Sequence, residues 1–139
     1  MKPNCLLLEY ISAEALAILE AHTNVQVATT PASGMDIATK MPITAIVTRG
    51  SGMVNESLIK NCKGLKFIAR CGVGLDNVDI STASQLGIQV INAPGSNAAT
   101  VAEHTLALML AAQRQIHAYA KAAKNNNWTH RSQYGGDEI

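Results

Sequence analysis

The residues best suited to bind a small ligand form a glycine-rich turn, 72–74, which follows the apolar run 65–69. The two glycines that flank Val73 allow consecutive backbone N–H groups to point to the same side. A concavity lined by such donors binds anions, carboxylates included, without needing a charged side chain. The sequence therefore predicts that Gly72, Val73 and Gly74 cradle a small organic acid.

The same turn partly matches the pattern G-x-G-x-x-G, which holds the pyrophosphate of a dinucleotide at the start of a helix. Asn77 stands where the third glycine is required, and residues 92–99, where an acidic partner is expected, contain neither Asp nor Glu. Three interpretations stay open from these residues: an anion-binding turn, a plain strand-to-helix connection and a dinucleotide loop. The anion-binding turn is our working hypothesis.

Short apolar runs alternate with helical segments before this turn and after it. Such alternation is typical of repeated βα units and predicts an α/β fold with a five-stranded parallel sheet covered on both faces. The expected strands are 5–8, 25–28, 45–47, 66–70 and 88–91. Residues that start or stop helices lie between them. They are Ser12, Asn55, Asp79 and Gly87. Residues 31–34 are expected to break the second strand, before a short helix at 35–39.

Parallel α/β sheets bind their ligands at the carboxyl ends of the strands. Three turns, 48–53, 71–77 and 92–97, occupy that edge in the expected arrangement. Their glycines, together with Arg49 and Ser51, are therefore expected to converge on one crevice. Two interpretations of Arg49 stay open, because an arginine there either pairs with a carboxylate or phosphate or remains a solvated loop charge.

A long helical segment follows the last expected strand. Thr100 and Glu103 form the capping-box pattern T-x-x-E, and the helical signal continues to about Ala123. Residues 106–112 are apolar on every side, so this part of the helix needs cover from another domain or another subunit. The chain turns polar after Lys124 and offers no further element, which we interpret as an interrupted chain.

The bulk composition excludes several classes of function. Eleven Lys and Arg against ten Asp and Glu give a net charge of +1, which favours neither nucleic acid nor an acidic membrane surface as a partner. No run of apolar residues is long enough for a transmembrane helix. The chain has three cysteines, Cys5, Cys62 and Cys71, and none of them forms a C-x-x-C pair. An odd number without that motif disfavours a disulfide framework and a zinc site. It indicates a reducing compartment such as the cytoplasm.

Several motifs, taken in order, resemble the N-terminal part of the D-isomer-specific 2-hydroxyacid dehydrogenases, and in particular the phosphoglycerate dehydrogenase branch. The matching stretches are 47–52, 70–79, 87–94, 101–104 and 128–135. The resemblance implies that residues 1–98 form a flavodoxin-like three-layer sandwich that binds substrate. It also implies that residues 99–139 form an interdomain and dimerisation helix and the start of an NAD-binding Rossmann domain, most of which is absent from this sequence.

The resemblance also assigns roles to individual residues. It implies substrate contacts at Arg49, Gly50, Ser51, Gly72, Val73 and Gly74, and cofactor contacts at Val73, Thr100 and Val101. Some relatives carry a hydroxyl where Val101 stands. The family's catalytic arginine, glutamate and histidine have no counterpart in these 139 residues, and Glu103 and His104 are not those residues. No catalytic residue and no metal ligand is therefore expected in this chain.

Two functions follow as hypotheses. In the first, the chain is the substrate-binding part of an NAD-dependent oxidoreductase that acts on the CH–OH group of a 2-hydroxy acid, a cytoplasmic homodimer with a place in serine biosynthesis. The chain alone is then expected to be inactive. In the second, it is a free-standing flavodoxin-like module that binds small acids or associates with itself without catalysis.

Overall fold

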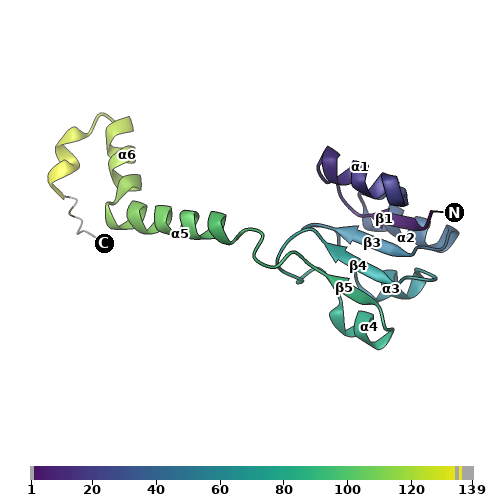
Figure 1. Ribbon diagram of the computed structural model, residues 1–139. Helices are drawn as coiled ribbons and strands as arrows, with labels where there is room; N and C mark the ends of the chain where they lie inside the picture. Colours follow the sequence, from purple (N-terminus) through teal and green to yellow (C-terminus); the bar gives the residue numbers. More distant parts are fainter. Residues whose placement is uncertain (1, 134, 136–139) are drawn as a thin grey trace. The chain divides into compact units, whose positions relative to one another are not determined.

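The computed structural model describes residues 2–133 and residue 135. The chain divides into an α/β unit, Met1–Ser96, and a helical unit, Asn97–Ile139. The first unit contains five parallel strands in the order β2-β1-β3-β4-β5, which is the order of flavodoxin-like sheets (Figure 1). The expected five-stranded parallel sheet is therefore confirmed. Its elements are β1 (Asn4–Leu7), α1 (Ala13–His22), β2 (Asn24–Val27), α2 (Pro31–Lys40), β3 (Ala45–Thr48), α3 (Glu56–Asn61), β4 (Phe67–Arg70), α4 (Ile80–Gln85) and β5 (Gln89–Ile91).

Side chains that alternate along the central strands build a separate core on each face of the sheet. Leu6, Ile46 and Ile68 are fully buried in the larger core, which the helices α2, α3 and α4 cover. Their neighbours Cys5 and Val47 belong to a smaller core beneath α1. Burying one such aliphatic side chain stabilises the fold by roughly 1.5–3 kcal/mol. The sheet is thus held rigid between two helical layers, and its carboxyl edge has a fixed geometry.

The helix signals expected in the first unit act as predicted. Ser12, Asn55 and Asp79 each accept a backbone N–H of the first turn, at 3.3, 3.0 and 3.0 Å. Gly87 follows α4 in the left-handed conformation, with φ of 66°, which a glycine adopts without steric cost.

The strand β2 ends at Val27, before residues 31–34, but the expected start of the next helix at residue 35 is wrong. Pro31 instead opens α2, where its missing N–H costs nothing because the first turn has no acceptor for it. Thr30 Oγ1 accepts from Ser33 N, and Ser33 Oγ accepts from Thr30 N, both at 3.2 Å. This reciprocal capping box starts the helix four residues earlier than the expected range 35–39.

The long helix of the second unit also differs from expectation in two ways. It begins at Ala98 as α5 (Ala98–Gln113), so Thr100 lies inside the first turn and the T-x-x-E box does not cap it. The two alanines before Thr100 have the highest helix propensity and extend the helix in the N-terminal direction. The helix then breaks at Gln115, whose φ of 47° is left-handed, before α6 (Ile116–Lys124) and the short 3-10 helix η1 (Trp128–Gln133).

The apolar side chains of α5 are exposed within the described part of the chain. They are Val101, Leu106, Leu108, Met109 and Leu110. Cover from another domain or subunit therefore stays a prediction. Across the described residues, none of the helices combines the length and the hydropathy that crossing a membrane requires.

Candidate functional site

Hydrogen bonds tie the loop after β3 to the turn after β4. Asn77 Nδ2 donates to the carbonyl of Gly52 at 2.8 Å, and the Asn77 carbonyl accepts from Val54 N at 2.8 Å. Asn77 is buried, as is Thr48, whose hydroxyl lies 3.2 Å from the same amide nitrogen. Asn77 thus joins the two turns.

The turn after β5 holds the other side of the glycine-rich turn. Asn92 Nδ2 donates to the Val73 carbonyl at 2.7 Å, and Ala93 N donates to the Gly72 carbonyl at 2.9 Å. All three turns therefore meet at the carboxyl edge of the sheet, with residues 72–74 in the middle.

The backbone N–H groups of residues 72–74 are not equivalent. Gly72 N donates to the Arg70 carbonyl at 2.8 Å, so this donor is occupied. Within the described residues, the N–H groups of Val73 and Gly74 meet no protein acceptor, and both residues are exposed. These two open donors are adjacent, and Asn92 holds the Val73 carbonyl between them. Such a pair of N–H groups is a suitable receptor for one carboxylate.

Arg70 packs against this turn, although it is not among the site residues that the sequence predicted. A Cβ atom on Gly72 would lie 2.1 Å from Arg70 Nη1 and 2.9 Å from Cζ, so a larger residue there would require the guanidinium to move. Arg70 Nε is buried and has no hydrogen-bond partner among the described residues. A permanently charged group thus adjoins the open N–H donors, which favours an anion there.

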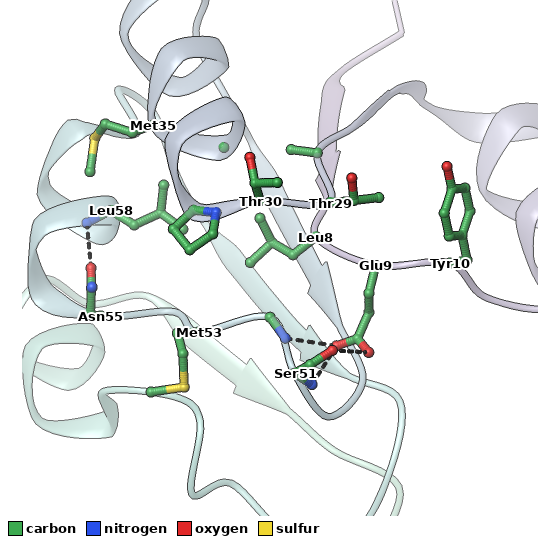
Figure 2. Close-up of a pocket in the computed structure, with 14 residues that line it drawn as sticks. Leu8, Glu9, Tyr10, Thr29, Thr30, Met35, Ser51, Met53, Asn55 and Leu58 are labelled. Carbon is green, nitrogen blue, oxygen red and sulfur yellow. Dashed lines mark hydrogen bonds between the residues drawn. The ribbon is translucent and has the colours of Figure 1, made fainter.

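The loop at residues 49–52 has its N–H donors occupied by the protein itself. One carboxylate oxygen, Glu9 Oε1, accepts from all four backbone N–H groups, and Glu9 Oε2 accepts from the Ser51 hydroxyl at 3.1 Å. Figure 2 shows the hydrogen bonds between Glu9 and Ser51. The four N···O distances are 2.7 Å for Arg49, 2.7 Å for Gly50, 3.1 Å for Ser51 and 3.0 Å for Gly52. An anion-binding concavity therefore exists at this loop, and its anion is internal.

Partial burial by itself raises the pKa of Glu9, but the hydrogen bonds from Gly52, Arg49, Gly50 and Ser51 outweigh it and lower the pKa to about 2. Glu9 is therefore ionised at neutral pH. What the loop still offers a ligand is the exposed side chain of Arg49, which forms no ion pair with any described residue. Gly50 and Ser51 contribute through the shape of the loop.

A cavity of about 480 Å³ is lined in part by Glu9 and by Ser51 and Gly52 of the 49–52 loop. Figure 2 shows its apolar wall, built by Leu8, Met35 and Leu58, with Glu9 and Ser51 at one end. Residues 72–74 do not line it. The cavity and the glycine-rich turn are thus separate features that share the 49–52 loop as a boundary.

The remaining candidate residues lie in the helical unit. Thr100 and Val101 are exposed in the first turn of α5, and their predicted cofactor contacts stay predictions. In the described part of the chain, His, Cys, Asp and Glu form no group that could hold a metal ion. Burial raises the pKa of the Cys5 and Cys62 thiols to about 11, so neither is a nucleophile at neutral pH.

The comparisons with known proteins agree on one family. The model of the "D-isomer specific 2-hydroxyacid dehydrogenase, catalytic domain" matches residues 5–134. D-3-phosphoglycerate dehydrogenase of Archaeoglobus fulgidus is 46% identical over 95 residues, which cover 68% of this chain and 18% of that protein. Hydroxypyruvate reductase of Thermotoga maritima is 41% identical over 86 residues, covering 62% of this chain and 28% of that protein. The chain thus matches less than a third of either relative's length.

A solved structure supports the same assignment. The 2-hydroxyacid dehydrogenase of Ketogulonicigenium vulgare Y25 superposes with a TM-score of 0.74 at 31% identity, covering 99% of this chain and 44% of that one. With the sheet order and the matched residues, these findings show that the chain belongs to the D-isomer specific 2-hydroxyacid dehydrogenase family.

Proposed function

We propose that this chain supplies the substrate-binding part of an NAD-dependent oxidoreductase that acts on the CH–OH group of a 2-hydroxy acid. The observation that carries the proposal is the pair of open N–H donors at Val73 and Gly74, which lie at the carboxyl edge of the sheet. The names of the relatives, D-3-phosphoglycerate dehydrogenase and hydroxypyruvate reductase, support a three-carbon acid as the substrate class.

The two N–H groups bind the substrate carboxylate and orient the carbon beside it. Asn92 and Asn77 hold the turn from both sides, so the donors are already in place before the acid arrives. The guanidinium of Arg70 makes the local potential positive. Arg49 is free to pair with a second anionic group of the substrate, such as a phosphate, in the bidentate manner typical of arginine.

NAD would supply the acceptor for the hydride that leaves the carbon carrying the hydroxyl group. The residues of this chain that we propose beside it are Val73, Thr100 and Val101, and all are exposed. The 139 residues contain no complete G-x-G-x-x-G motif, so these residues fit an edge contact with the cofactor and not its main binding site. The chain alone is therefore expected not to oxidise NADH in the presence of hydroxypyruvate.

The test is an amide-resolved NMR titration of the 139-residue chain with D-3-phosphoglycerate. The expected result is a saturable shift of the Val73 and Gly74 amides. Glycerol 3-phosphate, which keeps the phosphate and lacks the carboxylate, is the matched control and should leave these two amides unmoved. Equal responses to both compounds would count against the carboxylate role.

A second candidate function, self-association without catalysis, is favoured by the exposed apolar side chains of α5. We propose a homodimer in either case, since a helix with this surface is unfavourable in water. The cytoplasm remains the proposed compartment, supported by the free thiols of Cys5, Cys62 and Cys71. Steady turnover by the isolated chain would contradict the expectation that it is inactive alone, and a strict monomer would contradict the second function.

A further inference from the structure

Loop 49–52 has the construction of an anion receptor. Four consecutive N–H groups converge on one oxygen, Glu9 Oε1, at 2.7–3.1 Å. Gly52 is required for this arrangement, because a Cβ there would lie 2.6 Å from Leu8 Cβ and 2.7 Å from Thr48 Oγ1. A free carboxylate or phosphate would meet the same donors if Glu9 were absent.

This loop is coupled to the glycine-rich turn through a buried polar link. The Thr48 hydroxyl lies 3.1 Å from Glu9 Oε1 and 2.7 Å from the Gly52 carbonyl. Asn77 Nδ2 reaches the same hydroxyl and the same carbonyl, at 3.2 and 2.8 Å. Glu9 is therefore linked through Thr48 to Asn77, which lies in the same turn as Val73 and Gly74.

We propose that Glu9 is a positioning and specificity-determining residue, which fills the receptor at loop 49–52 with an internal carboxylate and thereby confines the substrate carboxylate to the amides of Val73 and Gly74. The filled receptor stands on the geometry alone, whereas the confinement of substrate rests on the proposed function.

The number of donors explains why the side chain of Glu9 needs to occupy loop 49–52. An empty loop would present four N–H groups and the Ser51 hydroxyl, against two open N–H groups in the glycine-rich turn. Hydrogen bonds to a charged acceptor are stronger than those between neutral groups, so an empty loop with more donors would compete for the acid and hold it away from residues 73–74. The side chain of Glu9 removes this competitor.

The experiment replaces Glu9 by alanine in the 139-residue chain and adds sodium formate while the amides of residues 49–52 are followed by NMR. In Glu9→Ala, formate should produce saturable shifts at these amides, with an affinity at least about tenfold above that of the parent chain. Glu20→Gln, an exposed change on α1, is the matched control and should behave as the parent. No saturable response in a folded Glu9→Ala, or the same response in the parent, would overturn the proposal.

If Glu9→Ala does not fold, Glu9→Gln supplies the result. It keeps an acceptor oxygen and removes the charge, so the amides of Arg49 and Gly50 should move upfield while the core amides stay in place. Unchanged amides at 49–52 would refute the filled receptor.

The same titrations separate this inference from the proposed function. D-3-phosphoglycerate should shift the amides of residues 50–52 only in Glu9→Ala, and those of Val73 and Gly74 in the parent. A response at 73–74 without any at 50–52 in the variant defeats this inference alone. The reverse pattern defeats the proposed function and leaves the filled receptor standing.

Discussion

At the scale of single residues, the carboxyl edge of the sheet contains two sets of backbone donors that differ in occupancy. The N–H groups of residues 49–52 are held by Glu9, and those of Val73 and Gly74 are open among the described residues. Both sets lie in glycine-containing turns of similar composition, so only their partners distinguish them. The exposed, open pair at Val73 and Gly74 is therefore the set of donors that a ligand can reach.

The contribution of Glu9 to stability depends on pH in a defined direction. Its folded-state pKa is lowered from 4.5 to about 2, so the ionised form stabilises the fold fully above about pH 4.5. This stabilisation is lost as the pH falls towards 2. Glu9→Gln should lower the free energy of unfolding by about 2 kcal/mol at pH 7. It should also flatten the acid limb, the part of the profile at which the free energy of unfolding falls with falling pH. Urea unfolding at a series of pH values measures both effects, and an acid limb identical to that of the parent would contradict the assignment.

Two glycines of the same loop make a matched pair. Gly52→Ala places a methyl group against Leu8 Cβ and Thr48 Oγ1, atoms that cannot move without the backbone, and should cost about 1–3 kcal/mol. Gly50→Ala meets nothing within 4 Å and should change stability by less than about 0.5 kcal/mol. Thermal unfolding of both variants checks the difference, and equal losses would show that the close approach at Gly52 is not limiting.

The candidate site was only partly predictable from the sequence. The turn at 72–74 was found because two glycines after an apolar strand limit the local geometry to a few shapes. Glu9 was missed because its partner loop lies 40 residues away, and only the pairing of β1 with β3 brings the two together. Arg70 was missed as well, since its packing on Gly72 depends on a side-chain conformation.

At the scale of secondary-structure elements, the capping role that the sequence suggested for Thr100 is not observed, and Thr30, which the sequence did not single out, is a cap. Thr30 caps α2 through the box with Ser33, whereas Thr100 lies within the first turn of α5. Thr30→Ala should therefore destabilise its unit by about 1 kcal/mol, and Thr100→Ala should have no cost because alanine favours helix interiors. Urea unfolding followed through amide signals of each unit tests the pair. A larger loss at Thr100 would contradict the observed helix start.

The strands and most caps were predictable because their signals are local. Apolar runs such as 45–47 and caps such as Ser12 need only a few neighbouring residues to act. The start of α2 was predicted wrongly because a proline such as Pro31 either ends or opens a helix. Which of the two occurs here depends on Ser33, which completes the capping box. The break at Gln115 carries no glycine or proline, so no local signal announces it.

At the scale of the whole molecule, the exposed surface of α5 predicts association. Leu106 and Leu108 on this helix are more than half exposed, at 56% and 58%. Sedimentation at several concentrations should show a dimer that dissociates on dilution. Leu106→Glu should shift it towards the monomer, while His104→Glu, a change at an already polar position of the same helix, should not. A monomer at every concentration would contradict the proposed role of α5.

Family membership and fold are shown for this chain, while substrate and cofactor depend on the site at the carboxyl edge. Its most direct test is a crystal structure of the chain with D-3-phosphoglycerate bound. The result that we predict is a carboxylate oxygen within about 2.7–3.2 Å of the backbone nitrogens of Val73 and Gly74, with Glu9 still in the 49–52 loop. A carboxylate bound elsewhere, with those two nitrogens hydrogen-bonded to the protein's own carbonyls, would contradict the account.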